Sequence, residues 1–429
     1  MPRLIVRNIG PIKSVEIELT PVTVFIGPQS SGKSTLSKII SFCFWMEKDA
    51  VFRQSISHID LDFIKEQLLS FHKIENYLNE SPYIYYESSV IVFNTDFKSV
   101  QINKAGGFRF AKNGKIAYIP SERNIINLPG IQSLPLKRNN IRSFIFDWFR
   151  SHSCYTKETP VDLGILNAKF YYDDALKQDI IVASNGKTML LEESSSGMQS
   201  FVPLYVYINY LTDWIFTHEP EVSFEDKAIL DNSIAIKYAE YALKPTDGFN
   251  DLSDDFFEDD EVKNVVSQLC AKINTIRNKY QGDEKVAPIL EPYLAVEELL
   301  LKTHYTKIII EEPEQNLFPE TQSQLVKMIF NQIDNKRDSI VITTHSPYVL
   351  ATLNNLIYAH NVGQNNSKEV EEIIPSQSWI DYNSVKAYYI NQGFLLSMND
   401  DELRLLKPEM IDDISSDLNN EFDKLMELE

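Results

Sequence analysis

The 429-residue sequence has few cysteines and no long apolar run. Both features limit the classes of protein to which it can belong. Only Cys43, Cys154 and Cys270 are present, far apart and with no CxxC pair, which argues against a zinc ribbon and against a secreted disulfide framework. No apolar run reaches the length of a membrane span, and the opening residues lack the apolar core and cleavage site of a signal peptide. These absences predict a cytoplasmic protein with no membrane partner.

Positive charge is also scarce. The chain has 41 lysines and arginines against 61 aspartates and glutamates, a formal net charge of −20. A surface this acidic repels nucleic-acid phosphates unless its cations are gathered into one patch. The hydrophobic fraction of 43% is ordinary for a folded protein, and the length suits two or three lobes around a substantial core. We therefore expect an enzyme-sized folded body for which DNA is not the default partner.

The first third of the sequence predicts strands, a loop and a helix. Two short strands over 4–10 and 14–19 precede an apolar strand over 21–27, which runs into a glycine-rich turn and a helix over 31–46. The remaining expectations for this part are a helical stretch over 61–80 and short strands over 83–120 with a turn at Gly106-Gly107.

The rest of the sequence alternates between helical and strand patterns. Apolar strands at 306–314 and 338–347 are separated by one helix, an order that implies a parallel sheet and an α/β fold. The acidic residues 251–261 are predicted to be a solvated, mobile connection. The other predicted elements are helices over 131–150, 261–280, 291–304 and 411–428, strands over 168–174, 178–184 and 385–393, and a helix that opens at the serines 194–196.

A glycine-rich phosphate-binding motif follows the third strand. Residues 27–34, GPQSSGKS, fit GxxxxGK[ST] in full, after an apolar strand and at a helix start. In such a loop the backbone N–H groups surround phosphate oxygens, Lys33 neutralises the β/γ charge, and Ser34 offers a hydroxyl to Mg²⁺. The alternative, a chance Gly/Ser turn, does not explain this context. The predicted ATP contacts are Gly27, Gln29, Ser30, Ser31, Gly32, Lys33, Ser34 and Thr35.

Two carboxylates end the apolar strand at 306–314. Glu311 and Glu312 come at the carboxyl edge of the predicted sheet, where α/β folds place their ligands. We expect Glu311 to hold Mg²⁺ and Glu312 to orient or deprotonate the water that attacks the γ-phosphate. Taken alone, this pattern also fits a surface-exposed strand end.

His345 ends the next apolar strand and is followed by Ser346-Pro347. A histidine at this edge can reach the γ-phosphate, whereas the alternative is a satisfied core or capping histidine. The cluster Ser194–Gln199 opens a helix, so its hydroxyls and N–H groups can face an anion, although an ordinary helix cap has the same composition.

In this order the motifs resemble those of stand-alone prokaryotic ATPases related to RecF, SMC and the ATPase half of OLD-family nucleases. The resemblance implies an ABC/RecF-like head that hydrolyses ATP and dimerises head to head, with catalytic Glu312 and His345 and a D-loop at 315–317. Ser196, Gly197 and Gln199 match the ABC signature and are expected to contact ATP in trans, with Met198 in place of its second glycine. The matching segments are RNIGPIKS, GPQSSGKST, YIPSER, SSSGMQ, EEPEQNLFPETQ and TTHSPYVL.

The resemblance also implies a division of the chain and shows two departures. We expect a discontinuous ATPase lobe (1–130 and 302–365), a helical signature lobe (131–301) with an acidic insertion (246–261), and a C-terminal appendage (366–429). Where the family pattern has a glutamine Mg²⁺ ligand, this sequence has YIPSER, so Glu122 or Arg123 is the candidate replacement. Gln29 stands where asparagine is usual, a change that we expect the loop to tolerate.

The motifs leave three cellular roles open. The first is an ATP-gated switch or scaffold for a separate effector such as a nuclease, as in two-component anti-phage systems such as PARIS or Septu, with a self-dimer or higher oligomer. The second is a RecF-like DNA clamp that uses the basic stretch 137–142 with Trp148 and Arg150, for which a solvated helix face is the alternative. An importer subunit fits the motifs less well. We expect the acidic cluster 400–402 to be a surface turn.

Overall fold

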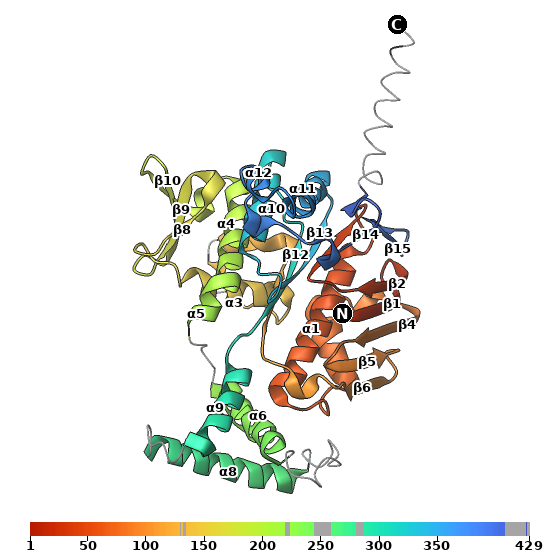
Figure 1. Ribbon diagram of the computed structural model, residues 1–429, viewed down its shortest axis with the longest axis vertical. Helices are drawn as coiled ribbons and strands as arrows, with labels where there is room; N and C mark the ends of the chain where they lie inside the picture. Colours follow the sequence, from red (N-terminus) through yellow and green to blue (C-terminus); the bar gives the residue numbers. More distant parts are fainter. Residues whose placement is uncertain are drawn as a thin grey trace.

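The computed structural model describes residues 1–128, 130–131, 134–218, 224–243, 259–279, 287–407 and 426. Its centre is a six-stranded sheet in the order β15, β14, β3, β13, β12, β7 (Figure 1). The five strands from β14 to β7 run parallel, and β15 pairs antiparallel with β14 at one edge. The strands are β3 (Val22–Ile26), β7 (Lys115–Ile119), β12 (Thr306–Glu311), β13 (Ser339–Thr344), β14 (Val385–Asn391) and β15 (Phe394–Ser397).

Strand β3 lies inside this sheet and is buried along its whole length. Its side chains alternate between two hydrophobic clusters, as the two-residue repeat of a strand requires. Val22 and Val24 pack in the cluster that contains the helices α4, α10 and α11, whereas Phe25 packs in the cluster that contains α1. These helices are α1 (Lys33–Arg53), α4 (Ser196–Asn209), α10 (Pro319–Gln332) and α11 (Pro347–Gly363).

A five-stranded antiparallel sheet, in the order β2, β1, β4, β5, β6, packs on α1 from the side away from the central sheet (Figure 1). Helix α1 is therefore enclosed between two sheets, and fourteen of its residues are buried. The strands of this sheet are β1 (Arg3–Ile9), β2 (Ile12–Glu18), β4 (Leu78–Glu87), β5 (Ile91–Thr95) and β6 (Val100–Lys104).

The remaining elements form two further groups around the core. A four-stranded antiparallel sheet lies beside α3 and α4, and α6, α8 and α9 pack together as a separate helical group (Figure 1). Their bounds are α3 (Asn140–His152), β8 (Val161–Asp162), β9 (Ala168–Asp173), β10 (Gln178–Ala183), β11 (Thr188–Leu190), α5 (Ile215–Thr217), α6 (Phe224–Leu243), α8 (Asp260–Lys279) and α9 (Ala287–Leu301). The short elements are α2 (Leu61–Ile64), the π-helical turns η1 (Lys65–Ser70) and η8 (Tyr210–Trp214), η2 (Glu75–Tyr77), η4 (Ser121–Asn127), α12 (Ser367–Glu371), β16 (Asn399–Asp400) and β17 (Leu405–Leu406).

The structure corrects three expectations. The helical stretch predicted over 61–80 ends near residue 72, and Leu78 already belongs to β4, which pairs with β1. The helix predicted over 131–150 begins at Asn140, because the side chain of Asn139 accepts a hydrogen bond from the N–H of Arg142 and caps it there. Strand β14 is not part of an appendage, because it pairs with β3 in the central sheet.

Two other expectations concern residues outside the described part. The acidic connection 251–261 is described only from residue 259, and the amphipathic helix at 411–428 only at residue 426. Among the described helices we find none with the length and apolarity of a membrane span.

Candidate nucleotide-binding site

The loop between β3 and α1 can form only with glycine at two positions. Gly27 has φ +152° and Gly32 has φ +110°, conformations that side-chain-bearing residues rarely adopt. A Cβ atom at Gly27 would strike the carbonyl oxygen of Ile390 in β14, and one at Gly32 would strike the side chain of Ile12. The loop is therefore held closely between β14 and the β1–β2 turn, with the tip residues Gln29 and Ser30 exposed.

The side chain of Lys33 reaches back to this loop. Its buried ammonium donates hydrogen bonds of 2.8 Å to the carbonyl oxygens of both Gly27 and Pro28. Burial lowers the pKa of Lys33 to about 8, against the opposing effect of nearby glutamates. The hydroxyl of Ser31 is buried and has no hydrogen-bond partner among the described residues. A buried cation and an unpaired hydroxyl at the start of a helix fit a phosphate group.

The first carboxylate of β12 lies against the start of α1. Glu311 is 3% exposed, and its Oε1 accepts a hydrogen bond of 2.8 Å from the hydroxyl of Ser37. Burial raises the pKa of Glu311, and hydrogen bonds from Ser37 and Ser34 act in the opposite direction. The structure thus brings Ser34 and Glu311 together, and their hydroxyl and carboxylate oxygens are ligands that suit Mg²⁺.

The second carboxylate turns toward His345. Glu312 has a left-handed backbone, with φ +45°, and its N–H donates to the carbonyl oxygen of Thr343 in β13. Its Oε1 lies 3.3 Å from Nε2 of His345, whose Nδ1 lies 3.3 Å from Nζ of Lys33. Because the ammonium can only donate, Nδ1 accepts and the ring proton is on Nε2, facing the carboxylate. This hydrogen bond lowers the pKa of Glu312.

Two further side chains fix this edge of the sheet. Oε1 of Glu314 accepts hydrogen bonds from the hydroxyl of Thr344 (2.8 Å) and the N–H of His345 (2.7 Å), which anchors the end of β13. The guanidinium of Arg123 is fully buried, and burial lowers its pKa to about 10. It donates to carbonyl oxygens of Pro120, Ser200, Glu311, Glu312 and Pro313. Arg123 is thus committed to backbone groups and is not placed to replace the missing glutamine ligand.

The serine cluster lies at the N-terminus of α4. Ser195 caps the helix by accepting from the N–H of Met198, and Ser196 is exposed in the first turn. The side-chain amide of Gln199 donates back to the carbonyl oxygens of Glu192 and Ser194, so it supports the cap. Among the described residues, no hydrogen bond or ion pair joins 194–199 to the loop at 27–35.

The neighbouring turn lies against this cap. The side chain of Asn316 donates to the hydroxyl of Ser200 (2.9 Å), and a Cβ atom at Gly197 would lie 3.2 Å from the carbonyl oxygen of Asn316. The segment 315–317, predicted to be a D-loop, therefore contacts α4 of its own chain.

Two protein-family models match the chain. A model described as an AAA domain matches residues 3–193, which contain the phosphate loop, and one described as an AAA ATPase domain matches residues 294–350, which contain Glu311, Glu312 and His345. Each model thus covers one half of the site described above. The chain is an ATPase with a phosphate-binding loop. A search of curated proteins found no match to the ATPase.

Several solved structures are similar to the ATPase at low sequence identity. The SMC head domain from Thermotoga maritima is 10% identical, covers 92% of this chain and 97% of its own, and has a TM-score of 0.36. The recombination mediator protein RecF is 12% identical, with coverage of 92% and 97% and a TM-score of 0.29. A dimeric ATP-binding cassette bound to ADP and phosphate is 11% identical, with coverage of 91% and 96% and a TM-score of 0.27.

Sequence reasoning about the ATPase missed three residues that shape the site: Ser37, Arg123 as a positioning group, and Glu314. Ser37 lies one helical turn after Ser34, and this spacing alone could have indicated that both hydroxyls share a face. The structure also corrects one expectation about DNA contacts. Trp148 is fully buried and packs against Phe170, so it cannot stack on a base.

Proposed function

We propose that two copies of the ATPase close head to head around ATP and Mg²⁺, each lending its signature helix to the other's phosphate loop. The main supporting observation is that Ser196 is exposed and that, in the described part of the chain, no hydrogen bond or ion pair joins the start of α4 to the phosphate loop. A helix N-terminus favours an anion, so a second copy can satisfy it with the γ-phosphate.

Exposed aromatic side chains near this edge support an interface. Phe318, directly after the 315–317 turn, is 74% exposed, and Tyr348, three residues after His345, is 49% exposed. Aromatic side chains are enriched at protein interfaces, where their burial supplies much of the binding energy. In the proposed dimer both would be covered by the partner copy.

Each polar group at the site has a proposed role in hydrolysis. Lys33 would exchange its carbonyl contacts for phosphate oxygens, and Ser34 and Glu311 would hold a Mg²⁺ ion, which would neutralise charge that develops on the phosphates. Glu312, kept ionised by His345, orients the attacking water and accepts its proton. His345 donates from Nε2 toward the γ-phosphate once Glu312 turns to the water.

The dimer can be tested directly. Glu312→Gln should bind ATP without turning it over and should elute as a dimer in ATP and as a monomer in its absence, measured by gel filtration with light scattering. Lys33→Ala is the matched control and should stay monomeric in both conditions, because its loop lacks the phosphate cation. A Glu312→Gln protein that stays monomeric at saturating ATP would refute the proposed dimer.

For the cellular role, the proposal is a switch or scaffold that holds a separate effector in anti-phage defence. It is motivated by the resemblance of the motifs to anti-phage ATPase subunits and by the net charge of −20, which disfavours direct DNA contact. Tagged Glu312→Gln, purified from its native host in ATP, should recover a small neighbouring protein in stoichiometric amount by mass spectrometry. Protection of cells by this chain alone would refute the role.

A RecF-like role in DNA maintenance is the second candidate. Its supporting observation is that Lys48, Lys115, Arg138 and Arg150 line two adjoining hollows between α1 and α3. Duplex DNA binding measured by fluorescence anisotropy should then weaken steeply as salt rises. No binding at low salt would remove this candidate.

A further inference from the structure

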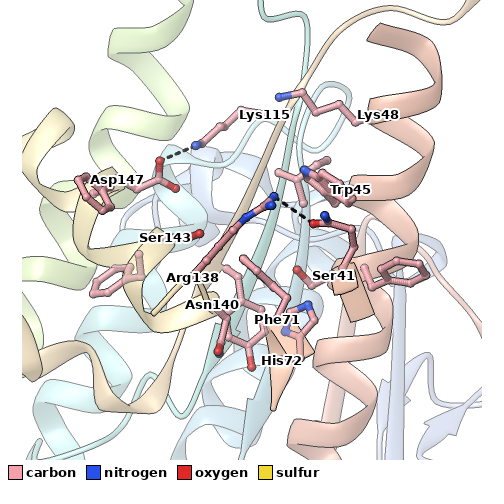
Figure 2. A pocket seen from close by; sticks show the side chains of 16 residues that line it. Ser41, Trp45, Lys48, Phe71, His72, Lys115, Arg138, Asn140, Ser143 and Asp147 are labelled. Carbon is pink, nitrogen blue, oxygen red and sulfur yellow. Dashed lines mark hydrogen bonds and ion pairs between the residues drawn. The ribbon is translucent and has the colours of Figure 1, made fainter. Parts of the chain in front are cut away.

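A second cavity of about 350 Å³ lies away from the phosphate loop, between α1, the π-helical turn η1, the strand β7 and α3. Figure 2 shows its lining side chains, which come from all four elements. Its volume falls within the range of small-molecule sites. The part of α1 that it touches, from Ser41 to Lys48, begins two helical turns after Lys33, so this cavity is separate from the ATP site.

One end of the cavity has buried polar groups, one of which lacks a partner among the described residues. His72 is 2% exposed, and its Nδ1 has no hydrogen-bond partner among the described residues. The amide of Asn140, only 6% exposed, lies at the same end (Figure 2). Leaving a buried polar group unpaired costs about 1–3 kcal/mol, so the unpaired nitrogen of His72 indicates a polar ligand.

The walls of the cavity are aromatic. Phe42, Trp45, Phe71 and Phe144 line it. Trp45 stacks on Phe63, with ring centroids 5.6 Å apart, and this contact fixes the plane of the indole. Rings held in this way suit a flat ligand that can stack on one face and meet others edge-on.

The other end carries positive charge. Figure 2 shows Lys48 and Lys115 at the end away from His72, with Arg138 between. Lys115 pairs with Asp147 at 2.7 Å, and Arg138 pairs with Glu66 at 3.1 Å, so both cations are held in place. These three cations face two carboxylates, Asp147 in the lining and Glu66 beside Arg138, so the cations are in excess by one. In a chain of net charge −20, such a local excess of cations favours an anion.

We propose that this cavity binds a nucleoside monophosphate or a closely similar nucleotide, with the base between the aromatic rings and the phosphate at Lys48, Lys115 and Arg138. His72 and Asn140 would hydrogen-bond to the base, because an amide and an imidazole can pair with its donor and acceptor edge. A monophosphate lacks the β-phosphate that the P-loop lysine contacts, so it discriminates between the two sites.

The experiment is a calorimetric titration of AMP, GMP, CMP and UMP into the full-length Lys33→Ala protein, in which the phosphate loop is disabled. At least one should bind saturably below about 1 mM. Ser143→Trp in the same background fills the cavity from α3 and should weaken that binding at least about tenfold. Arg138→Gln should weaken it about threefold to tenfold, because one phosphate contact is lost.

The control is Arg404→Gln. Arg404 is also about half exposed and faces a carboxylate, Asp381, but lies outside this cavity, so this change should leave the affinity within about twofold. Inorganic phosphate and the free nucleosides should bind more weakly than the matching monophosphate. No binding of any of the four, binding unchanged by Ser143→Trp, or binding only of a single-stranded DNA oligomer would overturn the proposal. None of these outcomes depends on the proposed ATP-driven dimer.

Discussion

Lys33, His345 and Glu312 form a continuous contact chain at the edge of the central sheet. The two distances of 3.3 Å on either side of His345 place a neutral imidazole between an ammonium and a carboxylate. The ammonium of Lys33 fixes the tautomer of the His345 ring. The ring proton then stabilises the negative charge on Glu312. The carboxylate of Glu312 is therefore kept in its ionised form, which can accept a proton from water.

Replacing Glu312 by glutamine should lower kcat for ATP hydrolysis by about 10²–10³. The affinity for ATP should stay within about threefold, because the phosphate loop is unchanged. Phosphate release and equilibrium nucleotide binding measure the two effects separately. Glu372→Gln, an exposed change directly after α12, should leave both values as in the wild type. Hydrolysis retained in Glu312→Gln would remove Glu312 from the mechanism.

His72 makes the folded state sensitive to acid. Burial, and secondarily the charge of Lys38, lower the pKa of His72 from 6.5 to about 3. The unfolded chain therefore binds a proton below pH 6.5 that the folded protein excludes, so stability is present above pH 6.5 and falls as the pH drops toward 3. Lowering the pH from 7.5 to 5.5 should lower the free energy of unfolding by about 1 kcal/mol through His72 alone. Urea unfolding of His72→Phe should show a correspondingly smaller pH dependence; an equal dependence would contradict this account.

The sequence predicted that the residues of the continuous motifs lie together at one edge of the sheet. Residues 27–35 are neighbours in the chain, and Glu311, Glu312 and His345 each end an apolar strand, so their meeting at one edge follows from a parallel sheet. Gln199 shows where prediction stops, because its match to a motif does not reveal that its amide turns back to the cap. Side-chain direction depends on packing that the linear pattern does not contain.

Arg123 joins two elements that must keep a fixed relation. Its guanidinium binds carbonyl oxygens at the end of β12, in the turn after it, and of Ser200 in α4, so the carboxylate edge of the sheet and α4 share one buried support. The planar guanidinium has five N–H donors and can reach these carbonyl oxygens at once, whereas the ammonium of a lysine cannot.

Arg123→Met should lower the free energy of unfolding by about 3–5 kcal/mol, because several carbonyl oxygens lose their donor inside the protein. Arg123→Lys should recover only part of this loss. In both variants kcat should fall more than ATP affinity, since the phosphate loop is not touched. Urea unfolding and steady-state kinetics measure the two effects. Equal stability of Arg123→Met and the wild type would show that the hydrogen bonds of Arg123 do not support the fold.

At the level of elements, local patterns predicted more than long-range pairing did. The strand at 385–391 was recognisable from its apolar residues, but its place beside β3 was not, because nothing in its own sequence states which edge of which sheet it joins. The helix predicted over 61–80 failed for the same reason, since pairing with β1 draws Leu78 into a strand.

For the whole molecule, mixing two inactive variants tests whether the sites are shared. Lys33→Ala lacks a working phosphate loop, and Ser196→Arg blocks the signature with a bulky charge, so each alone should hydrolyse no ATP. In a heterodimer, the loop of the second variant meets the intact signature of the first. An equimolar mixture should therefore regain about a quarter of wild-type activity, because half of the dimers carry one of two sites. No recovery would mean that each signature serves its own chain.

The position of β3 within the central sheet has a consequence for synthesis. Its two partner strands begin only at Ser339 and Val385, so the strand that carries the phosphate loop is made roughly 300 residues before either neighbour. At about 5–20 residues per second, a ribosome needs roughly 15 to 60 seconds to supply the first of them. During that interval the nascent chain exposes an apolar strand with unpaired edges, and it is a natural client for chaperones.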